Sequence, residues 1–142
     1  MSLQTVRTQL KSIVDGVKTA QAEISATLDY MPAQITATPL VCIIYDSANE
    51  DYATTGQNML EANFIIRVII DNTANYSTQN NLMLSIVDDL LDAFRLRTNQ
   101  TLGGNVYSTL VRSVSSIQSG LTENLSVLFV DIGVTAKGLK TT

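Results

Sequence analysis

The acidic side chains come closest to a set of residues that could do chemistry. Asp88, Asp89 and Asp92 follow one another closely in a predicted helix, where carboxylates could in principle hold a metal ion. Helical spacing instead puts Asp88 and Asp92 on one exposed side, which is typical of a solvated acidic face. A second acidic group lacks the alternating ligands and the closing Glu of a calcium loop: Asp46, Glu50 and Asp51. We therefore expect no metal site.

Nucleophilic and cofactor chemistry also lack their usual residues. The sequence contains no His, which removes the commonest general base and the commonest metal ligand. Cys42 is the single cysteine and lies inside an apolar run, where a small buried hydrophobe is expected and a disulfide is excluded within the chain. Gly103 and Gly104 precede a predicted strand and lack the Lys of a phosphate-binding loop. We expect no catalytic residue, no cofactor and no enzymatic activity.

The charge distribution indicates which partners the chain can have. The formal net charge is −4, and the nine Lys and Arg residues are scattered, which argues against a dedicated nucleic-acid-binding protein. Charged residues make up only 15% of the chain, against roughly 25% in average soluble domains. A surface with so little repulsive charge favours contact with other proteins. No apolar run approaches the ~20 residues of a membrane span, so we expect no membrane partner.

The stretch Met59–Asp71 is the element around which the rest is organised. Every second residue forms a wholly apolar face: Ala62, Phe64, Ile66, Val68 and Ile70. The opposite face mixes charged residues with Ile65 and Ile69. This alternation predicts a long strand with one face on a core and the other only partly wet.

The remaining periodicities predict an order of helix, strand, strand, helix, strand, strand. The expected bounds are 2–26, 40–45, 59–71, 78–97, 106–117 and 124–136. Ser2 is the expected N-cap of the first helix, and Ser77 or Thr78 that of the second. Asp46–Asn58 has little apolar content and is expected to be a loop, Gln118–Glu123 a turn, and 137–142 a fraying tail.

This order predicts one α+β domain over residues 1–142. Two strand pairs would form a mixed or antiparallel four-stranded sheet, with both helices on one face. Apolar residues of the second face would then have no lid within the chain, among them Ile65, Ile69, Val127 and Phe129. Burial against another subunit would cover them.

The pattern resembles a known group of structural proteins. The residues that carry the resemblance are LQTVRTQLKSIV, then PLVCIIYD with an acidic stretch, ANFIIRVIID, LMLSIVDDLLDAF and ENLSVLFVDIGVTAKG. In element order, length and strand character they resemble the tail terminator, or tail completion, proteins of long-tailed bacteriophages, the group that includes the lambda-type terminator. The resemblance spans nearly the whole chain.

The resemblance implies a structural role in a virion, with assembly in the host cytoplasm. Terminators of this group form a hexameric ring that caps the tail tube, ends its growth and presents a surface to the head-side neck or connector protein. Contracting tails add a contact with the sheath protein, while DNA only passes through the lumen. The expected partners are therefore other copies of this chain, the tail tube protein and the neck protein.

A closed ring needs two different patches that meet on neighbouring copies. The sequence offers the 46–58 stretch and the uncovered sheet face for this purpose. The residues that we predict at subunit or tube contacts are Asp46, Glu50, Asp51, Tyr52, Ile65, Arg67, Ile69, Arg112 and Phe129.

Two other functions fit the same pattern. A head-side neck or connector ring also uses small α+β subunits, although more basic residues are expected there because of its closer contact with DNA. A cellular α+β ligand-binding or regulatory domain could instead dimerise through its open sheet face.

Overall fold

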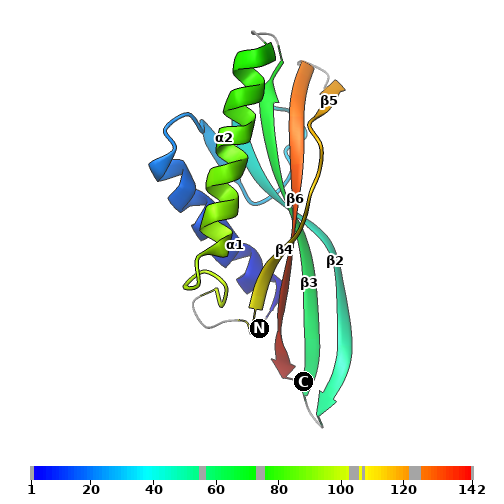
Figure 1. Ribbon diagram of the computed structural model, residues 1–142. Coiled ribbons are helices and arrows are strands. Elements are labelled where there is room, and N and C mark those ends of the chain that lie inside the picture. The colour runs from blue at the N-terminus through cyan, green and yellow to red at the C-terminus, as the bar shows by residue number, and fades with distance from the viewer. Residues whose placement is uncertain are drawn as a thin grey trace.

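The computed structural model describes residues 2–54, 57–72, 76–102, 106, 108–121 and 126–141. Two helices pack on one face of a mixed six-stranded sheet, so the chain has an α+β fold in two layers (Figure 1). The elements are α1 Leu3–Ala20, β1 Ala26–Leu28, β2 Leu40–Thr54, β3 Gln57–Asp71, α2 Tyr76–Arg95, β4 Ser108–Val114, β5 Gln118–Leu121 and β6 Ser126–Thr141.

The strands lie in the order β1-β2-β3-β6-β4, and β5 also pairs with β6. Only β1 and β2 are parallel, and the other pairs are antiparallel. The central strand β3 therefore has a partner along both edges. In one row across the middle of the sheet, Phe64 lies between Tyr45 and Val134.

The predicted apolar face of β3 forms the main core with both helices. Helix α1 contributes Val6, Leu10, Val14 and Val17, while α2 contributes Met83, Ile86, Val87, Leu90 and Phe94. Phe64 is at the centre of this core, is 1% exposed and contacts Tyr45 edge to face. The prediction that both helices cover one face is confirmed.

Both helix starts and ends can be compared with the expected bounds. Ser2 caps α1 as expected, because its Oγ accepts the N–H of Thr5 at 3.1 Å. The helix ends at Ala20 and not at residue 26. The longer helix was predicted because Ile24 continues the apolar spacing, but Ile24 follows a turn after the helix and is buried there. Helix α2 begins at Tyr76, so the residues expected as its cap lie in its first turn: Ser77 and Thr78.

The sheet has two more strands than predicted. The short β1 has three residues, too few to produce a detectable alternation. The predicted strand 106–117 ends at Val114, and Gln118–Leu121 is strand β5 where a turn was expected. Ser115 causes the break, since its N–H donates to Asp131 O at 2.9 Å and its Oγ accepts the N–H of Asp131 at 3.0 Å.

The largest correction concerns the expected loop 46–58, of which residues 46–54 and 57–58 lie in strands, while 55 and 56 lie outside the described residues. Strand β2 continues to Thr54 and β3 starts at Gln57, and the two are paired, with two register shifts, beyond the ends of the helices (Figure 1). Strand β6 accompanies them to Thr141, so the expected fraying tail is also a strand. We call this three-stranded extension, residues 46–54, 57–63 and 135–141, the arm. Its ladder of backbone hydrogen bonds holds it extended without the apolar alternation that reveals a half-buried strand.

The second face of the sheet is partly covered by the chain itself. A small core of Ile35, Leu40, Cys42, Ile69 and Val127 lies there, with Phe129 packed against it. The segment after β1 supplies Ile35, so the expectation that Ile69 and Val127 lack a lid within the chain is wrong. We call the face opposite the helices the outer face.

Candidate assembly interface

The nine residues predicted at contacts fall into two separate groups. Asp46, Glu50 and Asp51 lie on the arm and are exposed. The backbone of Tyr52 also lies on the arm, and its side chain is outside the described part. The other five residues lie on the outer face or at its edge strand β4: Ile65, Arg67, Ile69, Arg112 and Phe129.

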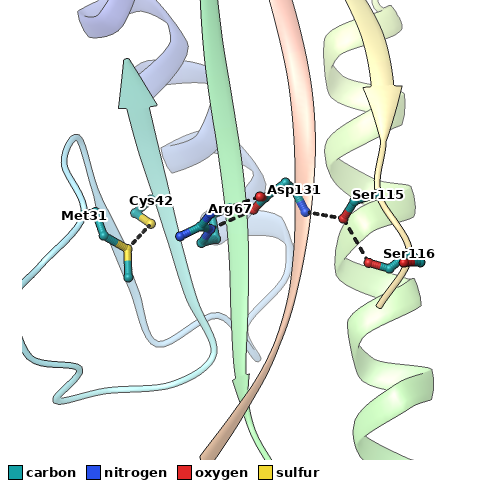
Figure 2. Close-up of polar contacts among 6 residues, drawn as sticks. All are labelled: Met31, Cys42, Arg67, Ser115, Ser116 and Asp131. Atoms are coloured by element: carbon teal, nitrogen blue, oxygen red, sulfur yellow. Dashed lines mark hydrogen bonds and ion pairs between the residues drawn. The ribbon is translucent and has the colours of Figure 1, made fainter. Parts of the chain in front are cut away.

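A partly buried ion pair occupies the centre of the outer face. Arg67 donates from Nε to Asp131 Oδ1 at 2.7 Å and from Nη2 to Oδ2 at 3.0 Å, a two-pronged contact between neighbouring strands (Figure 2). Hydrogen bonding to Asp131 raises the pKa of the Arg67 guanidinium, an effect that outweighs its burial. The guanidinium carbon also lies 4.9 Å from the ring centre of Phe129. Arg67 and Phe129 therefore contact each other within one subunit.

The same row continues on both sides of this ion pair (Figure 2). On one side Ser115 holds the backbone of Asp131, and its hydroxyl donates to Ser116 O at 2.9 Å. On the other side the Cys42 thiol contacts the Met31 sulfur at 3.7 Å. Burial raises the pKa of Cys42 to about 11, so the thiol stays protonated near neutral pH and is not a nucleophile.

A second ion pair crosses the outer face near the base of the arm. Arg112 Nη2 donates to Asp46 Oδ2 at 3.1 Å, although the two residues belong to β4 and β2. Each lies at a register shift of its strand, Asp46 between Tyr45 and Ser47, and Arg112 beside Ser113. Sequence periodicity could not place either side chain, because an extra residue reverses the alternation.

Gly133 makes room for this crossing. A Cβ at Gly133 would lie 2.6 Å from Ser113 Oγ and 3.0 Å from Arg112 Cζ. In the same row Ile65 is paired with Gly133 and is half-buried, whereas Ile69 is 1% exposed within the small core. Of the predicted outer-face residues, Ile69 is thus covered by the chain itself.

We call the part of the chain outside the arm the body. On the outer face, the arm carries polar contacts where the body has a small apolar core. Asn63 donates to Ser47 Oγ at 3.1 Å and accepts from Thr135 Oγ1 at 2.7 Å across three strands. Two rows further out, Lys137 and Glu61 are 3.6 Å apart and half exposed. These contacts hold the three strands in register and leave their outer side wet.

The described part of the sheet has a long unpaired edge on each side. Strand β1 pairs with only Leu40–Cys42, so no described strand pairs with that edge of β2 from Ile43 to Thr54, although β3 pairs with its other edge. On the opposite side, no described strand pairs with the far edge of β4. Two different open edges on opposite sides are suited to head-to-tail contact between copies.

Sequence reasoning missed Asp131 and Gly133, which fix the two ion pairs of the outer face. The sequence indicated only that both residues lie in a predicted strand. In the sheet, Asp131 is opposite Arg67 and Gly133 is opposite Ser113. Among the described residues, no group of His, Cys, Asp or Glu could hold a metal ion. No helix within the described ranges is both long and apolar enough for a membrane span.

Comparison with known proteins shows a shared fold and no detectable sequence family. No protein-family model matches the chain, and no curated protein matches it. A chain of the virion of a native gene transfer agent particle superimposes with a TM-score of 0.53 at 13% identity. The match covers 94% of each chain, so the similarity extends over the helices, the sheet and most of the arm. This chain therefore shares its fold with that chain.

Proposed function

We propose that this chain is a structural virion protein that assembles into a ring, caps a tail tube and joins it to the head-side connector. The observation that carries the proposal is the fold shared with a virion chain along 94% of both chains. The resemblance of the sequence pattern to tail terminators supports the finer role.

The arm is the part of the subunit that we assign to contact between copies. It projects beyond the helices, carries Asp46, Glu50 and Asp51 on its exposed strand, and has the unpaired edge of β2 along its length. In a ring, this edge would face the opposite edge of the next copy, at β4. A ring of this kind is heterologous and closes without leaving an unpaired edge.

The sequence predicts contact with another subunit or the tube for the outer face, whereas in this proposal most of that face supports the arm. Arg67, Asp131 and Phe129 contact one another within the subunit, so they stiffen the sheet from which the arm projects. Ile65 and the Arg112–Asp46 pair lie at the base of the arm, where they would border the neighbouring copy.

Deletion of the gene from the strain that produces the particle tests the assigned role. Loss of a tube cap should yield tubes of uncontrolled length without attached heads, visible by negative-stain electron microscopy. Complementation with the intact gene should restore uniform tails. Tails of normal length that lack heads would instead assign the chain to the neck ring, and intact particles would remove it from the virion.

A further inference from the structure

The exposed sides of α1 and α2 border an open groove of about 720 Å³. One wall is a single stripe of α1: Gln9, Ser12, Ile13, Gly16, Val17 and Ala20. The other wall belongs to α2 and the segment after it, and includes Asp89, Asp92 and Leu96. None of these residues belongs to the arm or to the outer face.

The α1 wall has the dimensions of a helix seat. From Gln9 to Ala20 it spans about 16 Å, or three helical turns. Ser12, Gly16 and Ala20 are small and recur at every fourth position, which opens a channel along the helix surface where another helix can approach closely.

Gly16 is unexplained by the chain's own packing. Its backbone is not in the left-handed region, and an added Cβ would meet no heavy atom of the described residues within 4 Å. Glycine costs a helix interior roughly 1 kcal/mol relative to alanine. Nothing inside the described chain requires this cost, whereas a close approach from outside would.

The chemistry of the groove is apolar at its base and acidic on one side. Val17 and Leu102 form buried parts of the lining, and Leu96 is 57% exposed above them. The lining includes Asp89 and Asp92 but no Lys or Arg. Asp89 is held in place by Gln21, whose Nε2 donates to it at 3.0 Å. An occupant therefore needs an apolar stripe with cations along one side.

We propose that this groove binds an amphipathic helix of a partner protein, about three turns long, with small or aliphatic residues against α1 and Lys or Arg against α2. A second copy of this chain does not fit. Its two described helices are themselves the walls of the groove, and the exposed side of α2 repeats the acidic charge with Asp88, Asp89 and Asp92. The inference is independent of ring assembly.

Selection from a displayed library of 16-residue peptides on the full-length chain tests this proposal. Enriched peptides are expected to be amphipathic helices with Lys or Arg on one flank. Their affinity, measured by fluorescence anisotropy, should fall at least tenfold for Gly16→Trp, which fills the groove. Gly16→Ala is the matched control, and should bind within threefold of the unchanged chain with an equal or higher Tm.

A charge variant separates the acidic wall from the shape of the groove. Asp92→Lys should weaken the basic peptides at least fivefold and reduce the salt dependence of their binding. The proposal is overturned by a selection that yields no binders, by binders without a basic flank, or by binders unaffected by Gly16→Trp. A dimer of the chain that Gly16→Trp dissociates would also overturn it and assign the groove to a second copy.

Discussion

The body and the arm are built from the same three strands, and their contrast shows which part of the chain folds it and which part is available for contact. In the body, β2, β3 and β6 are apolar toward the helices, and the outer face is partly covered by the segment before β2. In the arm, the outer face holds polar pairs such as Asn63 with Ser47. The strands remain paired throughout, so backbone hydrogen bonds continue where burial ends.

This difference teaches that strand formation and stability are separate properties here. Residues of the body contribute through apolar area removed from water, at roughly 25 cal/mol per Å². Apart from Leu60, Ala62 and Ala136, which are buried, residues of the arm contribute through exposed hydrogen bonds and ion pairs, each worth little. Substitutions along one strand should therefore change stability greatly on one side of the boundary and slightly on the other.

Phe64→Ala should have the largest effect, because Phe64 is 1% exposed and packs against Tyr45 at the centre of the core. We expect a loss of about 3–5 kcal/mol in the free energy of unfolding, measured by urea denaturation. Asn63→Ala, the adjacent residue on the outer face, is the control and should cost about 1 kcal/mol. Equal losses would abolish the distinction between body and arm.

Gly133→Ala should come second, because it acts where the arm joins the body. The new Cβ would lie 2.6 Å from Ser113 Oγ and 3.0 Å from Arg112 Cζ, so both side chains must move. A loss of about 1–3 kcal/mol is expected from overpacking. The same substitution in an Arg112→Ala, Ser113→Ala background should cost clearly less, and an unchanged cost would mean that this crossing is not the cause.

Asp15→Asn should reveal a smaller, pH-dependent contribution at the edge of the body. Burial raises the pKa of Asp15, but hydrogen bonds from Lys11 and Thr27 and the charges of Lys11 and Lys18 together lower it below its ordinary value. A lowered pKa stabilises the folded chain above the unfolded value of about 3.9, and this contribution is lost as the pH falls through the folded pKa. Because Asp15 is half exposed, the difference between the two proteins at pH 6 should stay below about 1 kcal/mol.

Thermal unfolding of both proteins at pH 6 and pH 2.5 measures this contribution. The unchanged chain should be the more stable one at pH 6, and the two should converge at pH 2.5. If the difference in stability between the two proteins is the same at both pH values, the loss comes from altered packing or hydrogen bonding of the side chain and not from its charge.

Glu61→Gln should have the smallest effect, because its ion pair with Lys137 is exposed and lies in the arm. We expect a change of about 0.3 kcal/mol, which 0.5 M salt should erase. A loss above 1 kcal/mol in chemical denaturation would show that the arm contributes to stability as the body does.

The sequence allowed the body to be predicted and left the arm unseen, for a physical reason. Phe64, Ile66 and Val68 recur at every second position because one face of β3 is buried, and such burial leaves a period of two in the sequence. The stretch from Asp46 to Thr54 buries no comparable face, so its composition resembles a loop although most of its backbone is paired with β3. Pairing without burial leaves no periodicity to detect.

The candidate interface was predictable only in part. An acidic stretch and a second sheet face with apolar residues could be recognised in the sequence, and their role in contacts between copies stays a prediction. The ion pairs were not, because Asp46 and Arg112 lie at register shifts that reverse the expected facing. Likewise the cover over Ile69 comes from Ile35, which lies in a segment without periodicity.

A shortened arm tests the central claim most directly. Glu50, Leu60 and Gly138 share one row, so an Asn-Gly turn can join Glu50 to Leu60 while the chain ends at Gly138. This variant keeps Leu60, which is 4% exposed, and removes only the outer arm. Sedimentation velocity should find a closed ring for the full chain and a folded monomer for the variant, with a Tm within about 5 °C. A variant that still closes rings, or one that unfolds, would contradict the assignment of the arm to contact between copies.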